Sequence, residues 1–150
     1  MRPRLFPPVI ALFMAGLMWL LHTYFPLLQL WQEPWNRIGF VLMAIAIIID
    51  AWSLALFFMH RTTPHPLKPE ETSKLVTGGM YQFTRNPMYL GLLLLLAGFA
   101  VYLGSLMPLA MLPLFVVLLT NRQILHEERV LEEKFGEEYR TYRERVRRWF

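Results

Sequence analysis

Long apolar stretches constrain this chain more than any other feature of its sequence. Residues 8–25 contain no Lys, Arg, Asp or Glu, and residues 38–59 contain one charged residue, Asp50. The uncharged run 88–120 is too long for one membrane crossing and long enough for two short ones. A soluble domain of 150 residues lacks the interior to bury a composition that is 55% hydrophobic. Lipid is therefore the solvent that this sequence requires.

These stretches predict an all-α integral membrane fold, a single domain of about four transmembrane helices with a cytoplasmic C-terminal helical segment. The crossings are expected at residues 8–25, 38–59, 88–103 and 106–120, the last two joined by a turn at Gly104 and Ser105. A cleaved signal peptide is the alternative for the first stretch. Bulky Trp19 and Phe25 stand where small cleavage-site residues belong, which favours a retained helix.

The basic residues predict the orientation. With four crossings, every Lys and Arg except Arg37 falls on one face of the membrane. The positive-inside rule makes that face cytoplasmic, so we expect an inner-membrane protein with both termini in the cytoplasm. Two polar segments then share the cytoplasmic face, a linker at residues 60–86 and a tail at residues 121–150.

Local helix breakers subdivide the linker and the tail. The linker opens with prolines that exclude regular helix, namely Pro64, Pro66 and Pro69. Gly78 and Gly79 predict a tight turn or a close approach of the backbone. Pro87 suits the first turn of the following helix, where its missing N–H costs nothing. The tail is expected to be helical as far as Phe135, to break at Gly136, and then to form a second helix.

Two adjacent carboxylates in the tail are candidates for chemistry. Helical spacing places Glu128 in the middle of an apolar stripe and Glu127 at its edge. A carboxylate on an inward face beside a membrane requires a cation or hydrogen-bond donors. Two interpretations remain open: a pair of acids that binds a cationic ligand group, or a salt bridge to Arg85 or Arg122 that joins the tail to the linker.

Other polar residues are less informative. Asp50 stands near the middle of its helix, where an unpaired charge costs about 3 kcal/mol or more. It is either a substrate-facing group or a protonated or hydrogen-bonded residue facing the bundle. His60, His65 and His126 lack the spacing of metal ligands, so no metal site is expected. The basic residues 140–148 are expected to meet anionic lipid headgroups rather than nucleic acid.

Two motifs in the C-terminal half resemble those of a known superfamily. The first reads GGMYQFTRNPMYLG at residues 78–91, and the second reads EERVLEEKFGEEYRTYRERVRRWF at residues 127–150. Their order and spacing resemble the membrane methyltransferases that act on isoprenylcysteine carboxyl groups and on phospholipid amines. The resemblance begins near Leu75, and the N-terminal half carries no motif that matches.

The resemblance implies S-adenosylmethionine as methyl donor and cofactor, held between the third helix and the tail. By motif position, the cofactor-binding residues would be Leu75, Val76, Tyr81, Asn86, Pro87, Met88, Tyr89 and Glu127. Glu127 would meet the ammonium group of the donor, with Glu128 as the alternative. Asp50, Arg122 and Glu128 are the candidates for catalytic roles, Glu128 as a proton acceptor should the nucleophile be an amine.

The chain departs from the superfamily pattern at two positions. Asn86 stands where many relatives have His, so a role that needs an imidazole is absent. Gln123 stands where the prenylcysteine enzymes have an arginine that binds the substrate carboxylate. Arg122 is adjacent but points about 100° away on a helix. This weakens carboxyl methylation in particular.

The function expected from these observations is methyl transfer from S-adenosylmethionine to a lipid-like or prenylated amphipathic acceptor at the cytoplasmic membrane face. Two alternatives are a sterol-type reductase that uses NADPH on a similar scaffold, and a non-catalytic membrane partner subunit. The sequence leaves open the identity of the acceptor, whether its nucleophile is N, O or S, and the oligomeric state.

Overall fold

The computed structural model describes residues 6–59 and 73–150. The first part of the predicted linker, residues 60–72, lies outside the described residues; it includes His60, Pro64, His65, Pro66 and Pro69. The described part of the chain contains six α-helices: α1 (Pro7–Tyr24), α2 (Ile38–Met59), α3 (Pro87–Leu103), α4 (Leu106–Leu119), α5 (Leu125–Phe135) and α6 (Glu137–Arg145). The first four begin and end within one residue of the ranges expected for the crossings.

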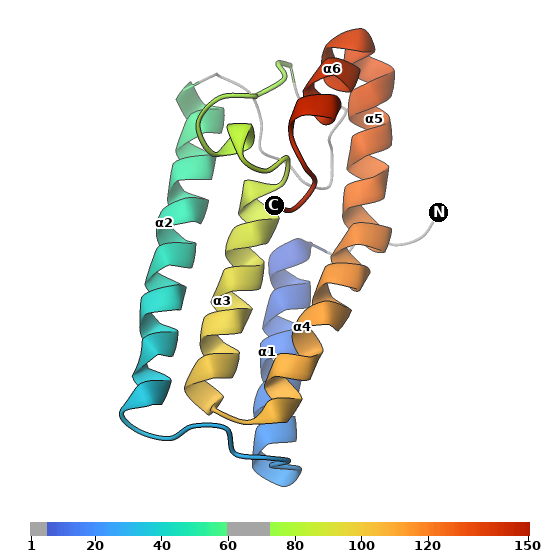
Figure 1. The fold of residues 1–150 in the computed structure, drawn as a ribbon. Helices are drawn as coiled ribbons and strands as arrows, with labels where there is room; N and C mark the ends of the chain where they lie inside the picture. The colour runs from blue at the N-terminus through green and yellow to red at the C-terminus, as the bar shows by residue number, and fades with distance from the viewer. Residues whose placement is uncertain (1–5, 60–72) are drawn as a thin grey trace.

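Helices α1–α4 run alongside one another, and α3 packs against each of the other three (Figure 1). Three helical spans are long and apolar enough to cross a membrane by length and composition: Pro7–Tyr24, Trp35–Leu56 and Leu106–Phe135. Helix α3 is apolar but shorter. The end of the linker and the tail lie at the same end of the bundle, here called the tail end (Figure 1). The prediction of an all-α integral membrane fold is confirmed.

Proline and glycine set the bounds of the middle helices. Pro87 occupies the first turn of α3, as predicted. The helix ends at Gly104, whose φ of 75° is in the left-handed region that glycine adopts without strain. Ser105 then precedes α4, so the predicted turn is present. This tight connection brings α4 back alongside α3 toward the tail end.

Helix α4 continues into α5 through a π-helical turn, η4 (Thr120–Ile124), so one helical rod leads from the bundle into the tail (Figure 1). The expected boundary at residue 120 is therefore not a break in the helix. The rod ends at Phe135, and Gly136 follows with a φ of 53°. Helix α6 then folds back toward the bundle (Figure 1). The predicted helix end and the predicted break are both confirmed.

Helices α2 and α3 approach so closely that their glycines cannot carry a side chain. A Cβ atom on Gly98 would lie 2.6 Å from the carbonyl oxygen of Gly39 and 2.9 Å from the backbone nitrogen of Met43. Ala46 and Ser53 repeat the position of Gly39 on α2 at heptad spacing, and both are fully buried. Small residues on one face let membrane helices pack backbone to backbone, and α2 uses such a face toward α3.

Gly98→Leu is expected to lower the free energy of unfolding by about 1–3 kcal/mol or more, because the new side chain must displace the backbone of α2. Gly16→Leu on α1 is the matched control, since a Cβ atom there meets nothing within 4 Å. Thermal unfolding of the detergent-solubilised variants measures the difference. Equal stabilities would show that α2 and α3 do not pack at this distance.

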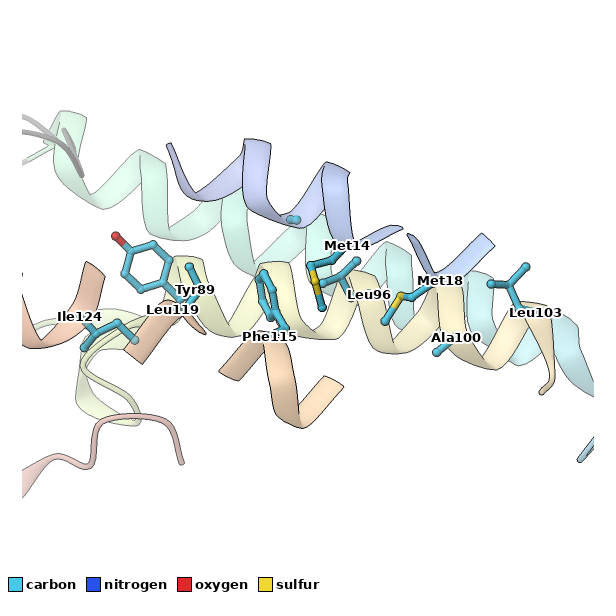
Figure 2. Packing of buried hydrophobic residues seen from close by; sticks show 10 residues of the cluster. Met14, Met18, Tyr89, Leu96, Ala100, Leu103, Phe115, Leu119 and Ile124 are labelled. Carbon is cyan, nitrogen blue, oxygen red and sulfur yellow. The ribbon is translucent and has the colours of Figure 1, made fainter. Parts of the chain in front are cut away.

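The hydrophobic core has two parts. An apolar cluster between α1, α3 and α4 extends along α3 from Tyr89 to Leu103 and includes Phe115 of α4 (Figure 2). A second cluster joins the end of α2, the end of the linker and the tail; it contains Leu56, Val76, Tyr81, Tyr139, Tyr142 and Val146. Because the second cluster packs the tail onto the bundle, the residues of the candidate site rest on a closely packed support.

Candidate functional site

A short 3-10 turn, η3 (Gly79–Gln82), forms one side of the site at the tail end. Gly79 has a φ of 58°, and a Cβ atom there would lie 2.7 Å from Leu56 at the end of α2. The tight turn and the close backbone approach that the sequence predicts are both present. The hydroxyl of Tyr142 in α6 donates to the carbonyl oxygen of Tyr81 at 2.7 Å, and both tyrosines are buried. Helix α6 therefore holds this turn in place.

The C-terminal segment, residues 146–150, lies along the residues that precede α3. The backbone nitrogen of Arg85 donates to the carbonyl oxygen of Arg147 at 2.9 Å. The side chains of Thr84 and Asn86 both donate to the carbonyl oxygen of Arg148, each at 3.0 Å. Asn86, which stands where many members of the superfamily have His, is therefore bound to the backbone of the C-terminal segment.

The same segment also reaches the π-helical turn. The indole Nε1 of Trp149 donates to the hydroxyl oxygen of Thr120 at 3.2 Å. A single π-helical turn inside a longer helix is often found at functional sites. Here the turn lies where the long helix leaves the apolar core, directly before the residues that carry the tail carboxylates.

Glu128 lies between two arginines. Arg148 donates to both of its carboxylate oxygens, from Nε at 2.8 Å and from Nη2 at 2.7 Å. Nη2 of Arg85 lies 3.1 Å from Oε1. Only 9% of the Glu128 side chain is exposed, and its hydrogen bonds raise the pKa of Arg148 above its ordinary value. Periodicity correctly predicted that Glu128 faces inward, and the salt bridge to Arg85 is confirmed.

Glu127 has different partners from its neighbour. Its Oε1 accepts hydrogen bonds from the Tyr89 hydroxyl and from Nε2 of Gln123, both at 2.6 Å. Tyr89 comes from the first turn of α3, so this contact joins α3 to the tail. Tyr89 and Gln123 are buried, whereas Glu127 is partly exposed. Two neutral, buried donors thus hold the carboxyl group of Glu127 at the edge of the packed core.

Asp50 lies on the face of α2 that packs against α3. A Cβ atom on Gly91 would collide with the carboxyl group of Asp50. The Asp50 side chain therefore fits here because residue 91 is a glycine. Its Oδ1 is buried and has no hydrogen-bond partner within residues 6–59 and 73–150. Burial raises the pKa of Tyr81, and the charges of Tyr142, Glu127 and Asp50 add to the rise. The carboxyl group of Asp50 lies within the α2–α3 contact.

The structure brings together most of the residues that the sequence singled out. Val76, Tyr81 and Pro87 are buried at the tail end, and Leu75, Asn86 and Met88 are partly buried there. Tyr89, Glu127 and Glu128 lie beside them. Arg122 is exposed on the π-helical turn, whereas Glu128 pairs with Arg85 and Arg148. Of the two partners expected for Glu128, Arg85 is the one that the structure shows.

Sequence reasoning missed two partners in the site. In the sequence, Gln123 stands out only as a departure from a superfamily arginine, although its spacing of four residues from Glu127 indicates a shared helix face. The sequence predicts Arg148 only as one of several surface arginines, because no local signal separates it from its neighbours. Its pairing with Glu128 depends on how α6 folds back.

The arrangement favours recognition of a small charged molecule by organic groups. A carboxylate with neutral donors suits a cationic ligand group, and the tyrosines supply flat apolar surface around it. Among the described residues there is no group of three or more His, Cys, Asp or Glu side chains placed to hold a metal ion.

Comparisons with known proteins find a family model and several relatives. The family model described as phospholipid methyltransferase matches residues 35–138. An uncharacterized protein of Haemophilus influenzae is 44% identical over 62 residues, which cover 41% of this chain and 98% of that protein. The protein-S-isoprenylcysteine O-methyltransferase B of Arabidopsis thaliana is 32% identical over 129 residues, covering 83% of this chain and 62% of the plant protein.

A third relative is the methanethiol S-methyltransferase 1 of Bradyrhizobium diazoefficiens, 34% identical over 93 residues, which cover 61% of this chain and 31% of that protein. The chain thus spans about three fifths of the length of its isoprenylcysteine relative and less of the methanethiol relative. No solved structure matches the chain.

Proposed function

The chain belongs to the phospholipid methyltransferase family, and on this premise we propose that it is an integral membrane methyltransferase that uses S-adenosylmethionine. Its acceptor is a lipid-like or prenylated amphipathic molecule. The observation that carries the proposal is the position of Glu127, held at 2.6 Å by Tyr89 and by Gln123 at the tail end of the bundle. This places a fixed carboxylate beside the apolar core.

The donor set fits the proposed cofactor. S-adenosylmethionine carries an ammonium group and a positively charged sulfonium, and Glu127 offers a carboxyl group that Tyr89 and Gln123 hold in position by hydrogen bonds. Val76 and Tyr81 contribute buried apolar surface beside it. When bound, the cofactor supplies an activated methyl group. The task of the protein is then to orient the acceptor and to exclude water.

The three candidates for catalytic roles divide by position. Asp50 lies in the close α2–α3 contact against Gly91, and it is the candidate for a group that faces the acceptor at the edge of that contact. Glu128 is held by two arginines and acts as a positioning residue for the tail. Arg122 is exposed, and its role is contact with lipid headgroups.

The proposed orientation places the tail end in the cytoplasm, with both termini on that side of the inner membrane. Exposed arginines of the tail then face anionic headgroups, each contributing about 1 kcal/mol to the interaction. The water-soluble donor enters from the cytoplasm, and the acceptor enters from the lipid. A site at the boundary between the two phases suits a reaction between partners of such different solubility.

Calorimetric titration of the detergent-purified protein tests the proposal, with S-adenosylmethionine, S-adenosylhomocysteine and NADPH as separate ligands. We expect saturable binding of the first two, about tenfold weaker in Tyr89→Phe, which removes only the hydroxyl that donates to Glu127. Binding of NADPH alone would replace the proposal with a reductase. Binding of none of the three would identify a non-catalytic subunit.

A further inference from the structure

Arg85 is a buried cation with hydrogen-bonding capacity to spare. Its side chain is only 9% exposed. Nη2 lies 3.1 Å from the carboxylate of Glu128, whereas Nε and Nη1 are buried without a hydrogen-bond partner in the described ranges, 6–59 and 73–150. Buried donors of a charged group are normally satisfied, because leaving them unpaired costs more than an ordinary hydrogen bond gains. The unused donors indicate a place for an acceptor.

The charges around Arg85 are also unbalanced. Arg148 occupies both oxygens of Glu128 at 2.8 and 2.7 Å, so Arg85 has the longer, single contact to a carboxylate that another arginine already neutralises. Two guanidinium groups therefore share one carboxylate. Burial and the charge of Glu128 raise the pKa of Tyr139 to about 12, and both the charge of Arg85 and its hydrogen bond to Tyr139 oppose that rise. Tyr139 is therefore a neutral partner of Arg85, and Nε and Nη1 of the guanidinium remain unpaired in the described ranges. The cluster is suited to an additional anion.

Arg85, which can bind an anion, lies close in the structure to Glu127, which can bind a cation. Arg85 contacts Glu128, and the next residue along the helix is Glu127. Arg85 also lies four residues before Tyr89, in the segment that leads into α3, and Tyr89 donates to Glu127. An amino acid carries an ammonium group and a carboxylate on one carbon atom, so it can present one charge to each of these two neighbouring groups.

We propose that Arg85 binds the α-carboxylate of the methyl donor while Glu127 binds its ammonium group. The inference rests on the proposed function. It adds a binding partner for the carboxylate of the donor, for which the sequence motifs assign no residue. Arg85 is then a ligand-binding residue as well as a partner of Glu128, and the guanidinium is held ready by Glu128 before the donor arrives.

The test compares two ligands that differ only in the group in question, S-adenosylmethionine and its decarboxylated form, by calorimetric titration. Wild-type protein is expected to bind the complete donor at least about tenfold more tightly. Arg85→Gln should lose about tenfold in affinity for the complete donor and little for the decarboxylated form. Arg148→Gln is the matched control, because it also removes an arginine from Glu128; it should affect both ligands equally.

Several results would overturn the inference. Equal weakening of both ligands by Arg85→Gln would make Arg85 a structural residue only. Unchanged affinities would assign its donors to another anion, such as an acceptor headgroup. Should Arg85→Gln fail to fold, equal affinities of wild-type protein for the two ligands would be decisive against it. Failure of wild-type protein to bind either ligand would instead remove the proposed function together with this inference.

Discussion

Glu128→Gln is expected to lower the free energy of unfolding by about 3–5 kcal/mol, the largest loss of stability among the substitutions considered. The change removes the negative charge of the carboxylate that Arg85 and Arg148 share. Arg148 is 35% exposed and can turn toward water, whereas Arg85 is 9% exposed and remains as an uncompensated buried charge. Thermal unfolding of the detergent-solubilised protein, followed by tryptophan fluorescence, measures the loss.

Glu132→Gln is the matched control for this substitution. Glu132 also pairs with two arginines, Arg140 and Arg143, but those partners are 55% and 45% exposed. Exposed ion pairs contribute about 0–1 kcal/mol, so the control should unfold close to the wild-type temperature. If the two variants lose equal stability, the burial of Glu128 does not increase the cost of losing its charge.

Glu127→Gln is expected to leave the fold intact and to weaken binding of S-adenosylmethionine by about 10- to 100-fold. A charge-assisted hydrogen bond contributes about 1.5–3 kcal/mol, and the substitution removes the charge with little change in volume. The amide oxygen of the new side chain can still accept from Tyr89 and Gln123, so the contact between α3 and the tail is preserved. Calorimetric titration gives the affinity, and thermal unfolding in the same detergent confirms the fold.

Glu133→Gln, an exposed neighbour on the same helix, controls for the loss of one negative charge. Its affinity for the donor should match that of wild-type protein. The two adjacent glutamates then separate cleanly: changing Glu127 affects binding, and changing Glu128 affects stability. Donor affinity that survives in Glu127→Gln and falls in a folded Glu128→Gln variant would exchange their roles.

The parts of the fold that depend on local signals could be predicted from the sequence. Pro87, Gly104 and Gly136 mark helix bounds because each limits the backbone at its own position, whatever surrounds it. The inward face of Glu128 follows from helical periodicity inside one uninterrupted helix, α5. Such inferences require no knowledge of how distant segments pack.

The remaining features depend on contacts between distant segments. The pairing of Arg148 with Glu128 requires α6 to fold back at Gly136, and no pattern within residues 140–148 distinguishes one arginine from the next. The π-helical turn adds to the difficulty, because it changes the helical phase between α4 and α5. The contact of Gly39 with Gly98 could have been predicted from the sequence, since small residues recur along both helices at heptad spacing.

The C-terminal segment has a consequence for the order in which the protein matures. Helices α2 and α3 can pair as soon as both are inserted, because their contact uses residues in the first two thirds of the chain. The tail end forms later, since Arg148 and Trp149 follow α2 and α3 in the chain and make contacts with Glu128 and Thr120. A nascent chain therefore acquires the contact between α2 and α3 before the contacts that hold the tail end. A chain shortened before Arg148 would keep the packed helix pair and would lack those contacts.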